Sequence, residues 1–142
     1  MTYTYFGDDF IQVQYRPYPN ASWTKDETFV ANVHILETYK KQIDKVLSRI
    51  NLDRYEDRYA LDELLDAPYE IYTFYQDGKP VKKIMVYGRV VENLLILSTI
   101  VDAALPYRYR SGYADFLIDL RERHNLDWIN PDKELALETD EK

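Results

Sequence analysis

The segment from Arg89 to Leu105 is apolar on nearly every side, and this constrains the fold more than any other feature of the chain. Its apolar positions include Val90, Val91, Leu94, Leu95, Ile96, Leu97, Ile100 and Val101. A helix that is apolar all round must be buried by other elements, because none of its faces suits water. We therefore predict a central helix that stops at Pro106. A strand at residues 94–101 is the alternative, because β-branched residues are frequent there.

Two pairs of strand-like runs are separated by turns that contain glycine. Residues 2–6 and 10–15 flank the turn at 7–9, and residues 69–76 and 81–87 flank the turn at 77–80. Aromatic and β-branched residues are frequent in these runs, and glycine allows the positive φ that tight turns need. The sequence therefore predicts two β-hairpins.

A long amphipathic helix is predicted between the hairpins, at about residues 25–50. Thr24 and Glu27 have the spacing of a capping box, which marks a helix start. Apolar residues then recur every three or four positions, at Phe29, Val33, Leu36, Ile43, Leu47 and Ile50. The alternative for the first part is a strand at residues 28–35, followed by a shorter helix.

Three further segments complete the predicted pattern. We expect an acidic helix at residues 53–66, a helix at about 112–124, and a short terminal helix that begins at Asn130 and Pro131. The order ββααββαα predicts an α+β fold in two layers, with both hairpins in one antiparallel sheet packed against about four helices. We assign residues 1–126 to a single domain and residues 127–142 to an acidic tail or short helix.

Negative charge is concentrated in two parts of the chain. The net charge is −7 over 142 residues, yet residues 53–70 hold seven acids and two bases, and residues 127–142 hold six acids and two bases. The other segments are nearly balanced. An acidic chain repels phosphate backbones, so direct binding of nucleic acid is not expected, whereas a basic protein is a suitable partner.

The residue types that carry most nucleophilic and metal chemistry are scarce. The chain has no cysteine and two histidines, and its four glycines form no phosphate-binding motif. We therefore expect no enzyme activity, no metal and no cofactor. The longest apolar stretch is shorter than the ~20 residues of a membrane span, and residues 1–15 lack the pattern of a signal peptide. A cytoplasmic location without membrane contact is expected.

Tyrosine is unusually frequent and marks two candidate surfaces. Five of the fourteen tyrosines are next to an arginine, and both residue types are enriched at recognition hot spots. The first surface is an acidic face formed by Asp53, Tyr55, Glu56, Asp57, Tyr59, Asp62, Glu63 and Asp66. At helical spacing its carboxylates would resemble the phosphates of a nucleic acid and suit a basic groove. The plainer interpretation is a solvated helix face.

The second surface is a Tyr/Arg connector formed by Arg16, Tyr18, Tyr107, Arg108, Tyr109, Arg110 and Tyr113. Guanidinium groups bind phosphate or carboxylate, and tyrosine rings stack on bases, so this group suits a nucleotide or another small anion. The plainer interpretation is that its arginines pair with the acidic helix at residues 53–66 and that its tyrosines cover the edge of the core.

These features together favour a small, non-enzymatic protein that inhibits a protein partner by occluding it. Small size, segregated acidic charge and the lack of a catalytic set are expected of phage-type inhibitors such as anti-CRISPR or anti-restriction proteins, and of immunity proteins that neutralise nucleases. The acidic face would steer a partner such as a basic nucleic-acid-binding protein, and tyrosines would anchor it. The alternative is a protein that binds a nucleotide or another small anion through the Tyr/Arg connector, for example in a homo-oligomer.

Overall fold

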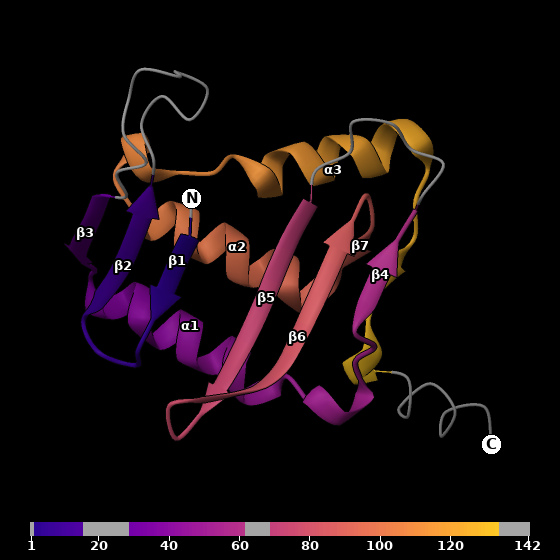
Figure 1. Cartoon of the computed structure of the whole chain (residues 1–142). Coiled ribbons are helices and arrows are strands. Elements are labelled where there is room, and N and C mark those ends of the chain that lie inside the picture. Colours follow the sequence, from indigo (N-terminus) through magenta and orange to yellow (C-terminus); the bar gives the residue numbers. More distant parts are fainter. Residues whose placement is uncertain (1, 16–28, 62–68, 134–142) are drawn as a thin grey trace, which may run out of the picture.

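The computed structural model describes residues 2–15, 29–61 and 69–133 (Figure 1). In this part of the chain the fold is mixed α and β, with three α-helices and three separate sheets. The larger strands lie in the foreground of Figure 1, and helices α1 and α2 lie behind them.

Sheet A is a three-stranded antiparallel sheet with the order β1-β2-β3. Strands β1 (Thr2–Tyr5) and β2 (Phe10–Tyr15) form the predicted first hairpin, and β3 (Phe29–His34) pairs with the other edge of β2. Ile11 and Val13 of β2 are completely buried. Successive side chains of a strand point to opposite faces, so Phe10, Gln12 and Gln14 lie on the outer face.

The long helix predicted for residues 25–50 is wrong in its described part, and the alternative of a strand before a shorter helix is confirmed. Residues 29–34 form β3, and α1 spans Glu37–Arg49. The three-to-four spacing was misleading because Val33 faces the core from a strand, whereas Ile43 and Leu47 face it from a helix. The capping residues Thr24 and Glu27 lie outside the described residues.

Sheet B has the order β4-β6-β5 and contains the second predicted hairpin, formed by β5 (Tyr69–Gln76) and β6 (Lys79–Tyr87). Its turn consists of Asp77 and Gly78, with φ values of 53° and 76°, which suit the right-handed twist of a hairpin. Strand β4 (Arg58–Ala60) runs parallel to β6. The prediction that both hairpins share one antiparallel sheet is therefore wrong for the described residues. The arrangement in two layers stays a prediction.

The acidic helix predicted at residues 53–66 is also wrong in its described part. Leu52–Arg54 form a single 3-10 turn, η1, and β4 follows it. Asn51 accepts a hydrogen bond from the backbone N–H of Asp53 and so caps this turn. A helix would place like charges one turn apart, which is unfavourable, whereas pairing with β6 satisfies the backbone of β4. Residues 62–68 lie outside the described residues.

Helix α2 (Glu92–Ala104) confirms the predicted apolar helix and excludes the alternative strand. Its residues contribute to three hydrophobic clusters: Leu97 and Ile100 pack with sheet A, Leu94 packs with sheet B, and Leu95 packs with α3. This central position explains why α2 is apolar on nearly every side. None of the described helices is long and apolar enough to cross a bilayer.

The remaining elements lie near the start or the end of α2. A 3-10 turn, η2 (Tyr107–Tyr109), follows α2 and leads to α3 (Tyr113–His124), which was predicted to within one residue. After α3, β8 (Trp128–Ile129) pairs in parallel with β7 (Val90–Val91), which directly precedes α2. The predicted terminal helix is a single 3-10 turn, η3 (Pro131–Lys133), within the described residues. Residues 134–142 lie outside them.

Candidate functional site

The outer face of sheet B, which is the face turned away from α2, is rich in exposed aromatic and aliphatic side chains. It consists of Arg58, Ala60, Tyr69, Ile71, Thr73, Tyr75, Pro80, Lys83, Met85 and Tyr87, as the strand register shows. Tyr69 and Tyr75 are 60% and 61% exposed, and Ile71 is 43% exposed. Single exposed apolar residues are ordinary, but a group of them on one sheet face is typical of an interaction surface.

Among the residues that the structure describes, this face of sheet B contains no carboxylate. The charged side chains that the described strands place on it are those of Arg58 and Lys83, although the chain has 25 acidic residues and a net charge of −7. The buried centres of protein interfaces are enriched in aromatic residues, methionine and arginine and depleted of aspartate and glutamate. The composition of the face therefore matches that of an interface centre.

The described part of the predicted acidic face lies beside sheet B. Asp53, Glu56 and Asp57 are exposed around η1 and the start of β4. Asp57 forms an ion pair with Lys82 of β6 at 2.8 Å. An open hollow connects η1 with the end of the second hairpin and is lined by Ile50, Asn51, Leu52, Asp53, Gln76, Val81 and Lys82. These three carboxylates form an acidic rim next to the outer face of sheet B. Asp62, Glu63 and Asp66 lie outside the described residues.

The two tyrosines that were predicted to anchor a partner on the acidic face have structural contacts instead. Tyr55 is only 4% exposed, so its ring is not available on the surface. Tyr59 is half-buried, packs edge-on against the Tyr55 ring at 6.5 Å, and accepts a hydrogen bond from the backbone N–H of Glu56. The prediction missed this because it assumed a helix at residues 53–66, whereas the described residues form a 3-10 turn and a strand.

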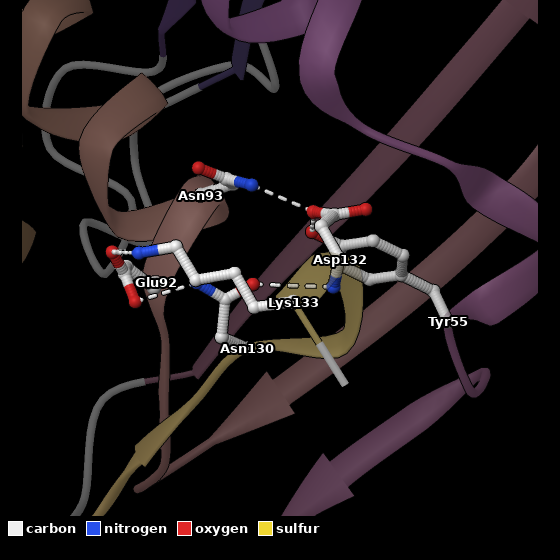
Figure 2. Close-up of polar contacts among 6 residues, drawn as sticks. All are labelled: Tyr55, Glu92, Asn93, Asn130, Asp132 and Lys133. Carbon is white, nitrogen blue, oxygen red and sulfur yellow. Dashed lines mark hydrogen bonds and ion pairs between the residues drawn. The ribbon is translucent and has the colours of Figure 1, made fainter. Parts of the chain in front are cut away.

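The Tyr55 hydroxyl belongs to a network centred on Asp132 (Figure 2). It donates to Oδ2 of Asp132, and Nδ2 of Asn93 donates to the same oxygen at 2.6 Å. The backbone N–H of Asn51 donates to Oδ1 of Asp132 at 2.8 Å. Burial, and then the hydrogen bond to Asp132, raise the pKa of Tyr55, so its hydroxyl remains a donor at neutral pH. The network joins η1, α2 and η3.

Asn130 and Glu92 extend the same network on the other side of Asp132. Oδ1 of Asn130 accepts from the backbone N–H of Asp132, and Nδ2 of Asn130 donates to Glu92 at 2.7 Å (Figure 2). Lys133 lies 3.6 Å from the carboxylate of Glu92. Sequence reasoning predicted Asn130 as a cap but missed Asp132, because its partners are 39 to 81 residues away.

The described residues of the predicted Tyr/Arg connector differ in exposure and in their contacts. Tyr107 is 86% exposed, and the Arg108 guanidinium lies 4.8 Å from the centre of the Tyr109 ring. Nε of Arg110 donates to the carbonyl of Leu105, at the end of α2. Tyr113 is buried in the core. Arg16 and Tyr18 lie outside the described residues.

The described part of the connector, residues 107–113, and the acidic rim lie at opposite ends of α2. Asn93, at the start of α2, is tied through Asp132 to Tyr55, whereas Leu105, at its end, is tied to Arg110. A helix of thirteen residues is about 20 Å long. The interpretation that Arg108 and Arg110 pair with residues 53–57 is therefore contradicted by the distance.

A second polar cluster links β5 to α2 and was not predicted. The Tyr72 hydroxyl donates to Oε2 of Glu70, and Oγ of Ser98 lies 2.6 Å from that hydroxyl and 3.3 Å from the carboxylate. Burial raises the pKa of Glu70 to about 7, against the opposing effect of these two hydrogen bonds. The Tyr113 hydroxyl is buried without a hydrogen-bond partner in the described structure. The sequence signal that could have predicted this cluster is the alternation of β5, which places Glu70 on the inward face of the strand.

The structure and the comparisons give no direct indication of chemistry. Among the described residues, no group of three histidine, cysteine or acidic side chains could hold a metal ion. No protein-family model, curated protein or solved structure matches the chain.

Proposed function

We propose that this protein is a non-enzymatic binding protein that inhibits a protein partner by occluding it, and that the outer face of sheet B is its main contact surface. The observation that carries the proposal is the group of exposed tyrosine and aliphatic side chains on a face to which the described strands contribute no carboxylate. Tyrosines at the centre of an interface contribute large contact area together with a hydroxyl group that can remain hydrated.

The physical form of sheet B supports such a contact. Tyr69, Ile71 and Tyr75 project from β5, whose backbone is paired along its length with β6. A surface held by a sheet loses little conformational freedom on binding, so less of the contact energy is offset by ordering. Lys83 is exposed on this face and provides donors for polar groups of the partner.

The acidic rim gives the proposed partner its chemical character. Asp53, Glu56 and Asp57 are exposed beside the contact face and add to the net charge of −7. Such charges increase the association rate with a basic protein more than they increase affinity. The proposed partner is accordingly a basic protein, such as one that binds nucleic acid, whose functional groove would be occluded.

Affinity purification with matched variants tests this proposal. The double variant Tyr69→Ser, Tyr75→Ser removes two rings from the face, whereas Tyr107→Ser removes an exposed ring from the connector. We expect wild type and Tyr107→Ser to retain the same partner and the double variant to lose it. With purified partner, the Kd should rise at least ~30-fold, which corresponds to ~2 kcal/mol for loss of a hot spot. Equal retention by all three proteins would refute the proposed surface.

A further inference from the structure

The described strands place no acidic or basic side chain other than His34 on the outer face of sheet A. The strand register places Thr2, Thr4, Phe10, Gln12, Gln14, Val30, Asn32 and His34 on this face. Phe10 is 42% exposed and Val30 is 54% exposed, and the Phe10 ring packs edge-on against His34 at 5.3 Å. The other side chains are amides and hydroxyls. This face differs from the outer face of sheet B, which has tyrosines and two basic residues.

The absence of charge matters because two copies of an acidic chain repel each other. The described carboxylates lie on the helices, in turns, on the acidic rim and on the inward side of β5. Contact between copies through those regions would bring like charges together. The described strands contribute no carboxylate to a contact through the outer face of sheet A, so the electrostatic cost of self-association is low there.

The chemistry of the face is also self-complementary. In a twofold interface the same surface meets itself, so each group must be able to pair with its own copy. Carboxylates and ammonium groups cannot do this, whereas amides and hydroxyls both donate and accept hydrogen bonds. The Gln14 amide donates to Oε1 of Gln12, which leaves the amide hydrogens of Gln12 for an acceptor on a second copy.

We propose that a second copy of this chain binds the outer face of sheet A, face to face, about a twofold axis close to Gln12. Gln12 lies on the central strand β2, between Thr4 of β1 and Asn32 of β3. Phe10 and Val30 lie on either side of this row and provide the apolar contacts. The proposal is independent of the partner proposed for sheet B, because it concerns a different sheet.

The size of the face sets the expected strength of the contact. Three strands about 4.8 Å apart and about six residues long, at about 3.4 Å per residue, cover roughly 300 Å² per copy. A standard stable interface buries about 800 Å² per partner. We therefore expect a weak, reversible dimer that forms at high protein concentration.

Sedimentation equilibrium of the whole chain between about 10 μM and about 1 mM tests the proposal. Wild type should show a monomer–dimer equilibrium. Gln12→Glu and Gln12→Lys should each weaken the dimer at least ~10-fold, because like charges would meet at the axis. An equimolar mixture of the two variants should restore dimers, because opposite charges then meet there. Gln42→Glu and Gln42→Lys change the same exposed amide on α1 and should leave the equilibrium unchanged.

Several outcomes would overturn the proposal. A wild-type chain that is monomeric over the whole range has no such interface. Unchanged association of both Gln12 variants, or equal weakening by the Gln42 variants, would place the contact elsewhere. A mixture that fails to restore dimers would show that the two residues at position 12 do not face each other. Circular dichroism of each variant checks that the fold is retained. None of these results affects the Tyr69 and Tyr75 test of sheet B.

Discussion

The Tyr55 hydroxyl donates a hydrogen bond to the carboxylate of Asp132, 77 residues further along the chain. Asn93 and the backbone of Asn51 donate to the same carboxylate. The last described turn of the chain is therefore tied to both α2 and η1. This relationship turns a tyrosine that was predicted to contact a partner into a packing residue, and it makes Asp132 a determinant of stability.

Asp132→Ala should lower the free energy of unfolding by about 3 kcal/mol, because it leaves the donors of the buried residues Tyr55 and Asn93 without their acceptor. Urea denaturation at neutral pH measures the change. Asp127→Ala removes an exposed carboxylate nearby and should shift the free energy by less than about 0.5 kcal/mol. Equal stability of the Asp132 variant and wild type would contradict the role of the network.

Stability should fall as the pH rises from about 4.5 to about 7. Burial raises the pKa of Glu70 from 4.5 in the unfolded chain to about 7, so the native state keeps a proton in this range that the unfolded state has released. The native state is favoured at the acidic end, and at most about 3 kcal/mol is lost by neutral pH.

Glu70→Gln tests the source of this pH dependence. The amide cannot titrate, so the variant should lose the decline between pH 5 and pH 7 and should be more stable than wild type at pH 8. Urea midpoints at pH 5 and pH 8 give the comparison. Asp115→Gln removes an exposed carboxylate on α3 and should keep the wild-type decline. If wild type and Glu70→Gln show the same decline, another group is responsible.

Charge reversal on the acidic rim should slow partner binding. Replacing Asp53, Glu56 and Asp57 together with lysine should lower the association rate constant about tenfold at low salt and flatten its salt dependence, because steering by these charges is lost. The dissociation rate should change little, since the charges lie outside the contact face. Stopped-flow kinetics with the partner isolated by affinity purification provide the measurement. An unchanged association rate would rule out steering by this rim.

If Arg108 and Arg110 of the Tyr/Arg connector bind nucleotides or other anions, these ligands should raise the melting temperature of the wild-type protein. A ligand-induced shift in wild type that disappears in Arg108→Ala would support that alternative function. In the absence of ligand, Arg110→Ala should cost about 1 kcal/mol, because the carbonyl of Leu105 loses its donor. Arg123→Ala removes an exposed arginine of α3 and serves as the matched control. No shift with any anion in wild type would count against the connector as a ligand site.

Local sequence signals predicted the elements whose backbone bonds are made within a short stretch of chain. The turn at Asp77 and Gly78 specifies the second hairpin, and the apolar run from Val90 to Val101 specifies α2. The strand at residues 29–34 was only an alternative, because its hydrogen bonds are supplied by β2. Strand β4 was missed for the same reason, since its pairing with β6 outweighs the local pattern of its sequence.

The sequence by itself determined the two hairpins, α2, α3 and the acidic charge, because turn residues, apolar periodicity and net charge are local or additive properties. Only the tertiary structure decided which tyrosines are exposed. Tyr55 and Tyr113 are buried, whereas Tyr69 and Tyr75 project from the outer face of sheet B, on which the described strands place no carboxylate. Exposure depends on what packs against a side chain, and these partners come from distant parts of the chain. For that reason the contact surface predicted from the sequence was an acidic helix, whereas the contact surface proposed from the structure is the outer face of sheet B.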